Sequence, residues 1–454
     1  MKHSLVTFLS LLILASMALT ACGAPEAAPA VPAAPVAEEA PAATEAPAAE
    51  APAAEEAPAA PEAQTVVIGF TSSLTGSQEV SSKRQVNGFN LWMNQVNDAG
   101  GVTLSDGTVV TFEYQTYDDE SNAERVQELY TRLINEDNAN FLISPYSSGL
   151  TSAASIVAEQ NETILITTGA ADDATYKTGN TSLFQLYTPS SLYMSSTVDM
   201  LKGLDPGAKV ALVYEADKFS TGVAEGIKPY LEANGFELVL EESYASDTAD
   251  FGPIVNKIAG SGATILLGGG HYNDGTALAR SIYDRNVGLK FAYLLVAPAD
   301  TKFPELGDAA LGIAVSSQWE LTATHNEAEA ANLGMDWFGP TGEDFAVSYE
   351  AAYGDAPTYH AAGGYAAGIV LQNAIIAADT IDTEAVKAAL NAMNLMTFFG
   401  GTKFDTSEEA HGLQVAHDMV VAQWQKNDAG EFTRVIIAPA DVATAAPLYP
   451  IPAQ

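Results

Sequence analysis

The stretch VVIGFTSSLTG, residues 66–76, decides the fold of this chain. Its first five residues form a short apolar run, which is typical of a strand buried on both faces of a sheet. An apolar stripe predicts a helix over residues 84–98, a strand over 109–117 follows, and Ser121 is placed to begin the next helix. The chain therefore opens with alternating strands and helices.

The same alternation continues in two successive runs. The expected strands cover residues 140–144, 163–167, 209–214, 236–242, 264–267 and 291–296, with helices between them. Consecutive strand–helix–strand units favour parallel sheets with helices on both faces. Two runs of them predict an α/β fold with two Rossmann-like lobes, whose strand ends face a shared cleft where ligands bind.

The C-terminal part departs from this rhythm. Three helices are expected first, over residues 341–353, 359–379 and 383–393. Strands over 415–425 and 432–437 then flank the turn sequence NDAG, which indicates a hairpin.

The first 21 residues have the pattern of a secretory signal. The base Lys2 precedes an apolar run over residues 5–19, and small residues lead up to Cys22. The sequence LTACG, residues 19–23, resembles the bacterial lipobox, in which the cysteine becomes the lipid-carrying N-terminus. Cys22 is the only cysteine of the chain. Its position therefore favours a lipoprotein over an incidental thiol.

A segment poor in large apolar side chains follows. Residues 23–64 hold 20 Ala, 9 Pro and 8 Glu, a composition that favours disorder. Repeated proline also favours an extended chain of about 3.1 Å per residue. We interpret residues 22–64 as a tether between the lipid anchor and the folded part, the alternative being a remnant of processing.

The composition excludes several classes of protein. Asp and Glu number 57 against 19 Lys and Arg, which gives a formal net charge of -38. Such a surface argues against binding to nucleic acid, whose phosphates need basic partners, and against adsorption to anionic lipid. A single cysteine excludes an intramolecular disulfide framework and any site built from several cysteines.

Motifs for catalysis or a cofactor are missing from the sequence. The glycines at 268–270 follow an expected strand, but Asn273 stands where a dinucleotide fingerprint needs glycine. There is no phosphate loop and no Gly-x-Ser-x-Gly elbow. A metal site at His411 and His417, six residues apart, is disfavoured by their spacing. We therefore expect no enzymatic activity, no cofactor and no metal.

Small polar loops at strand ends are the remaining candidates for a binding site. Tyr146, Ser147 and Ser148 lie between an expected strand and a helix, so hydroxyls and helix N-terminal amides are placed there to hold a carboxylate, or only to cap the helix. The loop after the next strand holds Gly169, Ala170 and Ala171. Its glycine lets a ligand approach the backbone closely.

Further candidates follow other strands or open a helix. They are Gly270, His271, Tyr272, Trp319, Glu320, Tyr359 and His360. Most of them offer aromatic or imidazole rings, and Glu320 offers a carboxylate. Trp319 suits a core position equally well.

Several of these segments resemble a known family. They are the lipobox, the tether, IGFTSSLTG (68–76), NGFNL (87–91), VNDAGGV (96–102) and YDD (117–119), with PYSSGLT (145–151), QWE (318–320) and YHAA (359–362) resembling one subgroup. Together they look like the periplasmic solute-binding proteins of branched-chain-amino-acid-type ABC importers, which have the type I periplasmic binding protein fold. The resemblance covers residues 65–440.

The resemblance implies roles for individual loops. The loop that begins at Ser147 binds the ligand carboxylate, and the loop at 169–171 contacts the polar head of the ligand. Phe219 matches a position that is often tyrosine. The segment 270–272 matches an aromatic contact after a strand of the second lobe.

One departure from the family concerns the ligand. Its amino-acid binders place a glutamate after the strand that matches 291–296, where this chain has Val296 followed by Ala-Pro-Ala. Either another acid, Glu320 or Asp118, pairs with the ligand ammonium, or the ligand is not an α-amino acid. A buried ammonium without a partner would be costly.

The fold so implied divides the chain into segments. These are a signal peptide (1–21), a tether (22–64), an N-terminal lobe (65–188 plus 318–396) and a C-terminal lobe (189–317 plus 397–446). Three crossings, near residues 186–190, 315–319 and 398–404, are expected to form a three-stranded hinge between the lobes.

The implied function is capture of an amino acid or a related small polar solute in the cleft, hinge closure, and delivery to the permease and ATPase subunits of an ABC importer. The protein would lie outside the cytoplasm, attached to the cell membrane through a lipid on Cys22. One alternative is a ligand-sensing domain that feeds a signalling receptor. Another is a binder of an amide, a short peptide or a small acid.

Overall fold

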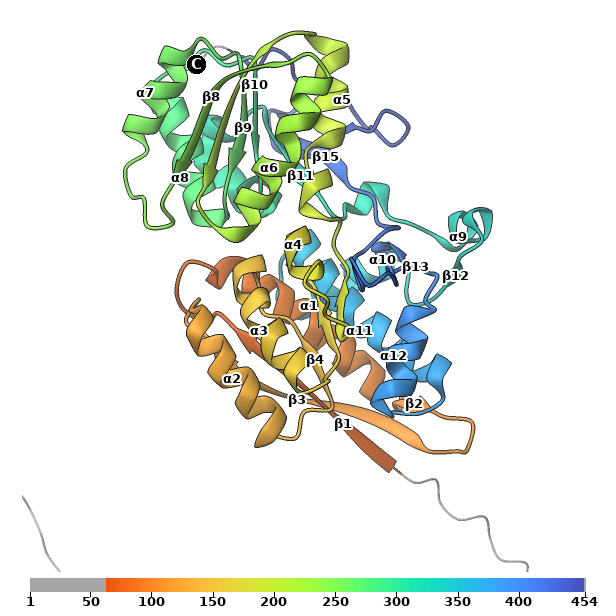
Figure 1. The fold of residues 1–454 in the computed structure, drawn as a ribbon. Helices are drawn as coiled ribbons and strands as arrows, with labels where there is room; N and C mark the ends of the chain where they lie inside the picture. Colours follow the sequence, from red (N-terminus) through yellow and green to blue (C-terminus); the bar gives the residue numbers. More distant parts are fainter. Residues whose placement is uncertain (1–62, 453–454) are drawn as a thin grey trace, which may run out of the picture. The chain divides into compact units, whose positions relative to one another are not determined.

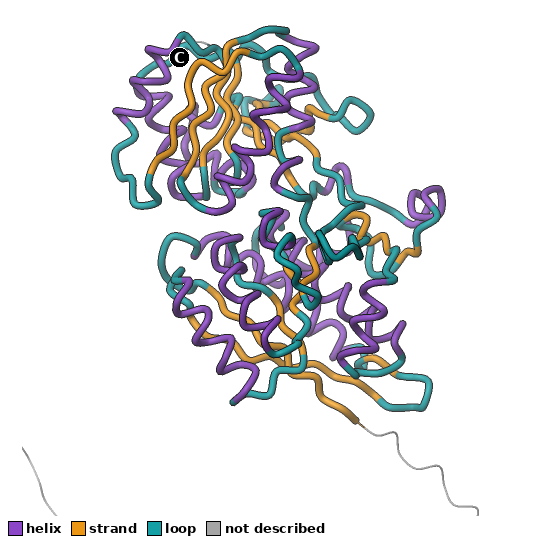
Figure 2. Tube along the Cα trace, viewed as in Figure 1, coloured by secondary structure: helices purple, strands orange, loops and turns teal. Residues whose placement is uncertain are grey.

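The computed structural model describes residues 63–452 of the chain. The predicted signal peptide, Cys22 and nearly all of the predicted tether lie outside the described residues. The first strand, β1, begins at Ala63, so it starts inside the segment predicted as tether. Figures 1 and 2 show the strands gathered into sheets with helices packed along their faces.

The first lobe is built on a six-stranded sheet with the strand order β2-β3-β1-β4-β5-β6. The strands are β1 (Ala63–Ser72), β2 (Val102–Thr103), β3 (Val109–Asp118), β4 (Phe141–Ile143), β5 (Leu165–Thr167) and β6 (Leu183–Gln185). All neighbouring pairs are parallel except β2 and β3. The connecting helices are α1 (Glu79–Asp98), α2 (Ala123–Asn135), α3 (Ser148–Gln160) and the short α4 (Asp173–Tyr176). Val66, Ile68 and Phe70 of β1 are buried, as the apolar run predicts.

The second lobe is built on a seven-stranded sheet with the order β16-β15-β11-β10-β9-β7-β8. Five parallel strands form most of it: β7 (Lys209–Glu215), β8 (Glu237–Tyr244), β9 (Ile265–Gly269), β10 (Phe291–Leu294) and β11 (Ile313–Ser317). The helices are α5 (Ser195–Leu204), α6 (Lys218–Ala233), α7 (Gly252–Ser261) and α8 (Tyr272–Asp284). The hairpin of β15 (Val420–Lys426) and β16 (Phe432–Ala438) adds to this sheet antiparallel.

These two sheets confirm the predicted α/β fold with two lobes, with one correction. Each sheet carries an antiparallel edge, so neither is purely parallel. The pairs β2–β3 and β15–β16 are each joined by a short connection, which allows only antiparallel pairing because a parallel partner needs a long crossover.

The start of α2 differs from its prediction. Ser121 has a positive φ of 58° and lies before the helix. Asn122 is the N-cap, and its side chain accepts the N–H groups of Glu124 and Arg125. The predicted apolar stripe is nevertheless buried, from Val126 to Leu133.

The remaining elements return to the first lobe or link the two. They are α9 (Glu327–Leu333), α10 (Gly342–Tyr353), α11 (Tyr359–Ala378), α12 (Thr383–Asn391), the small sheet of β12 (Asp336–Trp337), β13 (Leu395–Thr397) and β14 (Gly400–Thr402), and the 3₁₀ helices η1 (Ser190–Leu192), η2 (Ala297–Ala299), η3 (Phe303–Ala310) and η4 (Leu321–Ala323). By length and hydropathy α11 is apolar enough to span a membrane, but most of it is buried inside the protein. We interpret α11 as a core helix.

Three connections between the lobes are joined by hydrogen bonds. The Thr188 N–H donates to Gln318 Oε1 at 3.1 Å, and the Thr188 hydroxyl donates to the carbonyl oxygen of His417 at 2.9 Å. His417 Nε2 lies 3.0 Å from the carbonyl oxygen of Gln318. One residue from each connection therefore takes part, which makes this triad the hinge of the molecule.

The third connection lies later in the chain than predicted. The expected crossing at 398–404 instead belongs to the region beside β6, where the Gly412 carbonyl oxygen accepts the N–H of Gln185 and the Gln414 N–H donates to the Gln185 side chain. The chain passes to β15 only between Val415 and Met419, so the predicted strand at 415–425 also begins late. The structure therefore places residues 397–414 beside the first lobe and not in the C-terminal lobe as predicted, because local sequence does not reveal which lobe a segment joins.

Helices α1 and α11 approach each other closely in the core of the first lobe. A Cβ atom at Gly88 would clash with the backbone of Ala361, one at Gly364 with the backbone of Gln85, and one at Gly368 with the ring of Trp92. Glycine at these positions lets the two helix backbones come into contact. The tertiary contact offsets the poor helix propensity of glycine.

Replacing Gly364 with alanine is therefore expected to destabilise the first lobe by about 3 kcal/mol, because the new methyl group would push the helices apart. The melting temperature measured by circular dichroism should fall by at least about 3 °C. Gly260→Ala is a matched control, since Gly260 lies in helix α7 and a Cβ atom added there would have no neighbouring atom within 4 Å. The control should leave the melting temperature unchanged or raise it slightly, and an equal fall in both variants would contradict the interpretation.

Candidate ligand-binding site

The strand order of each sheet creates a crevice at one end. In the first sheet the chain leaves β1 for β3 on one side and later forms β4 on the other side of β1. In the second sheet β7 lies between β8 and β9 in the same way. Loops that leave neighbouring strands in opposite directions separate at the carboxyl ends, and ligands of open α/β sheets bind there.

A cavity lies where these strand ends meet. Its lining residues are Tyr146, Gly169, Ala171, Tyr187 and Tyr359 on the side of the first lobe, and Tyr193, Phe219, His271 and Val296 on the side of the second. The cavity has a volume of only about 10 Å³. That is far below the roughly 300–1,000 Å³ of pockets for drug-sized ligands. In this arrangement it is too small for a solute, so binding requires the lobes or the lining side chains to move apart.

Tyr146 connects the two lobes across the cavity. Its hydroxyl lies 3.0 Å from Nδ1 of His271, and its ring meets the His360 ring edge to face at 5.2 Å. Gly169 packs against the same ring with a φ of 71°, and a Cβ there would clash with Tyr146 and Gln85. The glycine is therefore required both by its backbone angle and by the close approach to Tyr146.

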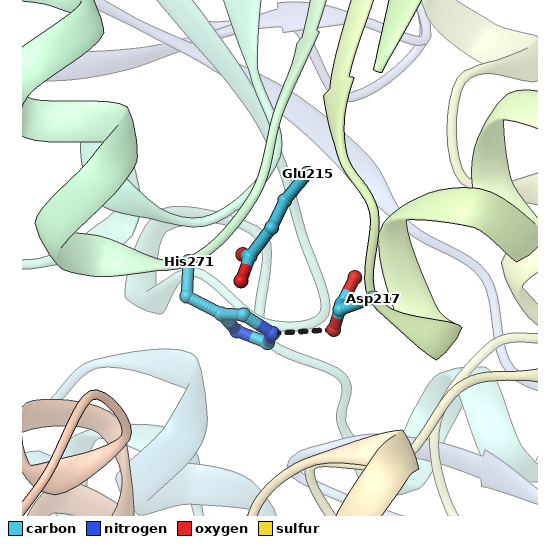
Figure 3. Close-up of side chains that lie close together, drawn as sticks. All are labelled: Glu215, Asp217 and His271. Atoms are coloured by element: carbon cyan, nitrogen blue, oxygen red, sulfur yellow. Dashed lines mark hydrogen bonds and ion pairs between the residues drawn. The ribbon is translucent and has the colours of Figure 1, made fainter. Parts of the chain in front are cut away.

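His271 is held on its other side by an acid. Its Nε2 lies 2.9 Å from Oδ2 of Asp217, and the carboxylate of Glu215 lies beside both groups, as Figure 3 shows. Burial by itself would lower the pKa of His271, but Tyr146 and the carboxylates of Asp217 and Glu215 outweigh it and hold that pKa well above its ordinary value. Burial likewise raises the pKa of Asp217, but the charge and hydrogen bond of His271 reverse the direction, and the pKa of Asp217 ends below its ordinary value.

Two further carboxyl groups near His271 have a raised pKa, in contrast to Asp217. Burial raises the pKa of Glu215 and the pKa of Asp274 above their ordinary values. Gly270 makes room for them, since a Cβ there would clash with both carboxylates. His360 is buried without a hydrogen-bond partner for its Nε2 among the described residues, and burial lowers its pKa to about 3.

Six of the residues singled out in the sequence line the cavity. They are Tyr146, Gly169, Ala171, Phe219, His271 and Tyr359. Ser147, Ser148 and Ala170 lie in the same loops but outside the lining. The Ser148 hydroxyl oxygen accepts the N–H groups of Ala171 and Asp172, both at 3.1 Å, so it joins the start of α3 to the neighbouring loop.

The other predicted residues lie away from the cavity. The buried Trp319 packs edge to face on Phe345 and Phe398, so it is a core residue. Glu320 forms an ion pair with Arg434 at 3.0 Å. Tyr272 packs against the core of the second lobe.

Sequence reasoning missed part of the lining and the acids behind it. Tyr187 and Tyr193 flank the first hinge connection. Val296, which the sequence marks only by the missing family glutamate, follows β10 and also lines the cavity. Glu215 ends β7 and Asp217 caps α6. Strand-end position could have drawn attention to Glu215, whereas the two tyrosines carry no local signal because their role depends on the hinge.

Ion pairs also join the lobes around the cavity. Arg84 of α1 pairs with Asp300 of the second lobe at 3.3 Å and with Asp355 of the first at 2.6 Å. Lys218 of α6 reaches Asp172 at 3.5 Å. These contacts stabilise the arrangement in which the lobes approach each other.

Two α/β lobes joined by three hydrogen-bonded connections, with an aromatic cavity between them, define the class of bilobed solute-binding proteins. The chain matches a family model described as "Periplasmic binding protein" over residues 65–430 and belongs to that family. The family consists of solute-binding proteins that act outside the cytoplasm.

The chain is similar to several named solute-binding proteins in sequence or in fold. The Leu/Ile/Val-binding protein homolog 7 of Brucella suis biovar 1 is 25% identical over 307 residues, which cover 65% of this chain and 74% of the relative. The branched-chain amino acid substrate-binding protein LivJ of Streptococcus pneumoniae, solved in complex with isoleucine, superposes with a TM-score of 0.68 at 20% identity and covers 83% of this chain and 100% of its own. An ABC transporter solute-binding protein of R. palustris, solved with benzoate, superposes with a TM-score of 0.68 at 18% identity and covers 86% of this chain and 98% of its own.

Breaking the Arg84 bridge should open the protein. Arg84→Gln leaves the buried Asp300 without its cationic partner, and an unsatisfied buried acceptor is expected to weaken the closed arrangement by about 1–3 kcal/mol. The radius of gyration measured by small-angle scattering should rise, and solute affinity should fall about tenfold. Lys290→Gln serves as the control, because Lys290 pairs with Asp205 within the second lobe. Identical scattering curves for Arg84→Gln and the unchanged protein would contradict this role.

Proposed function

We propose that the protein captures a small carboxylic acid without an ammonium group in the cavity between its lobes and delivers it to an ABC importer. Val296 is the observation that carries this proposal. It lines the cavity and begins the stretch 296–299, where the resemblance expects the glutamate that pairs with a ligand ammonium. An apolar side chain there offers nothing to a positive charge.

The two acids considered as substitutes are engaged elsewhere. Glu320 forms its ion pair with Arg434, and Asp118 accepts the N–H groups of Leu74 and Glu120 at 3.0 and 2.9 Å. Neither lines the cavity. An ammonium buried in this cavity would therefore lack a direct carboxylate partner, and a buried charge without one is costly.

The lining instead favours an acid with a flat or apolar body. Tyrosine and phenylalanine rings surround the cavity, and ring faces pack well on planar groups. Tyrosine hydroxyls donate hydrogen bonds to carboxylate oxygens. The benzoate complex of the R. palustris protein supports an aromatic acid as one such ligand.

A branched-chain amino acid is the second candidate. The name of the Brucella relative and the isoleucine complex of the Streptococcus protein support it. On this alternative Asp217 or Glu215 would have to reach the ammonium past the His271 ring.

The mechanism we propose uses the hinge at Thr188, Gln318 and His417. A solute that touches residues of both lobes stabilises the closed form through its differential affinity. The closed form then docks on a permease, and no bond of the solute is made or broken. We further propose that a lipid on Cys22 and the segment 22–64 attach the protein to the cell membrane. The alternative function is signalling, in which the ligand-bound form contacts a sensor protein and not a permease.

Matched pairs of solutes test the ligand class. Calorimetric titration should show 3-phenylpropanoate binding at least tenfold tighter than phenylalanine, and 4-methylpentanoate tighter than leucine, because each acid lacks only the ammonium of its partner. Benzoate should also raise the melting temperature. Tight binding of leucine or isoleucine without binding of the matched acids would overturn the proposal and favour the second candidate.

A substitution at Val296 tests the residue that carries the argument. Val296→Glu places a carboxylate against the ligand carboxylate, so the affinity for the best acid is expected to fall more than tenfold. Val296→Gln introduces a side chain of the same size as glutamate but without its charge, so it should reduce the affinity less than Val296→Glu does. Equal affinities of the Glu and Gln variants would show that charge at this position does not select the solute.

A further inference from the structure

A cluster of ionisable side chains lies at the switch point of the second sheet. Glu215 ends β7, Asp217 caps α6, and His271 follows β9. One donor atom of each lies within 4.8 Å of the others. Figure 3 shows the carboxylates of Glu215 and Asp217 turned toward the His271 ring.

The cluster contains a buried oxygen with no partner. Glu215 is only 4% exposed, and its Oε2 has no hydrogen-bond partner in the described part of the chain. Asp274 adds a third carboxylate next to Glu215 across Gly270. Among the described residues, these three acids pair with no Lys or Arg, and their basic partner is His271, which contacts Asp217. One imidazole does not balance three buried carboxyl groups, and buried charge without a partner is costly, so the site favours a further positive charge.

The donors are also held as metal ligands usually are. Oδ1 of Asp217 accepts the N–H of Ser220 at 2.7 Å, which leaves Oδ2 facing His271. Nδ1 of His271 contacts the Tyr146 hydroxyl, so its Nε2 points into the cluster. Hydrogen bonds of this kind orient ligating carboxylates and imidazoles in known metal sites.

We propose that Glu215, Asp217 and His271 form a binding site for one divalent transition-metal ion. An imidazole with two carboxylates is a donor set suited to Zn²⁺ or Mn²⁺, at ligand distances of about 2.0–2.2 Å for Zn²⁺. Oε2 of Glu215, which has no hydrogen-bond partner among the described residues, would be the oxygen that this side chain offers to the ion. The remaining coordination position would take water.

The proposed ion is coupled to the cavity through one ring. His271 would contact the metal with Nε2 and the Tyr146 hydroxyl of the first lobe with Nδ1. Metal binding would therefore fix the ring that lines the cavity and strengthen a contact between the lobes. This inference does not depend on which solute the cavity takes.

Titration of the EDTA-treated full chain with Zn²⁺ tests the proposal. Isothermal calorimetry should show one saturable site of micromolar or tighter affinity. Glu215→Gln and Asp217→Asn should each weaken it at least tenfold. Glu241→Gln is the control, because Glu241 of β8 pairs with Lys228, away from the cluster, and its substitution should leave the affinity unchanged.

Anomalous diffraction from Zn²⁺-soaked crystals of the unaltered protein gives a second readout that needs no variant. An anomalous peak within about 2.2 Å of the three donor atoms is expected. A protein that shows no saturable Zn²⁺ binding, a peak only elsewhere, such as at His325 and Glu329, or binding unchanged in both variants would overturn the proposal. Solute affinity is also measured in EDTA, where no metal is bound. A failure of the metal proposal can then be distinguished from a failure of the proposed solute binding.

Discussion

The hydrogen bonds among Thr188, Gln318 and His417 are the constraint on which the rest of the structure depends. They link the three connections side by side, so the carboxyl ends of the strands in both sheets face the cavity between the lobes. The hinge also builds the cavity directly. Tyr187 and Tyr193 flank Thr188 in the chain, and the Gln318 side chain donates to the Tyr193 hydroxyl at 2.9 Å. A movement of the hinge is therefore a movement of the cavity wall.

The two sides of the cavity bring different chemistry. The first lobe contributes tyrosine rings and a glycine loop, whereas the second contributes His271 with its acidic neighbours and the apolar Val296. The large negative charge of the chain, -38, does not decide the ligand, because only groups in and behind the cavity act at short range without screening. The position of each acid matters more than their number, and the acids lie behind His271 rather than in the cavity wall.

Much of the lining of the candidate cavity could be predicted from strand ends alone. Tyr146, Gly169 and His271 lie in loops after parallel strands, and such loops converge in any open α/β sheet. The sequence does not decide between a core and a site position for Trp319, because its ring favours burial in both. Glu320 and the third connection differ from expectation because local sequence reveals neither the tertiary partner of a side chain, here Arg434, nor the lobe that a segment joins.

The amino-acid sequence by itself determined the alternation of strands and helices, the apolar stripe of α2 and the two-lobe α/β class. These depend on propensities and spacings over a few residues, which the chain carries locally. Only the tertiary structure decided that Glu215, Asp217 and His271 meet. β7 and β9 pair with Tyr214 opposite Gly269, which brings Asp217 and His271 within 2.9 Å although they are 54 residues apart in the chain. Distance along the chain hides such contacts, because strand register, and not sequence spacing, brings the donor atoms together.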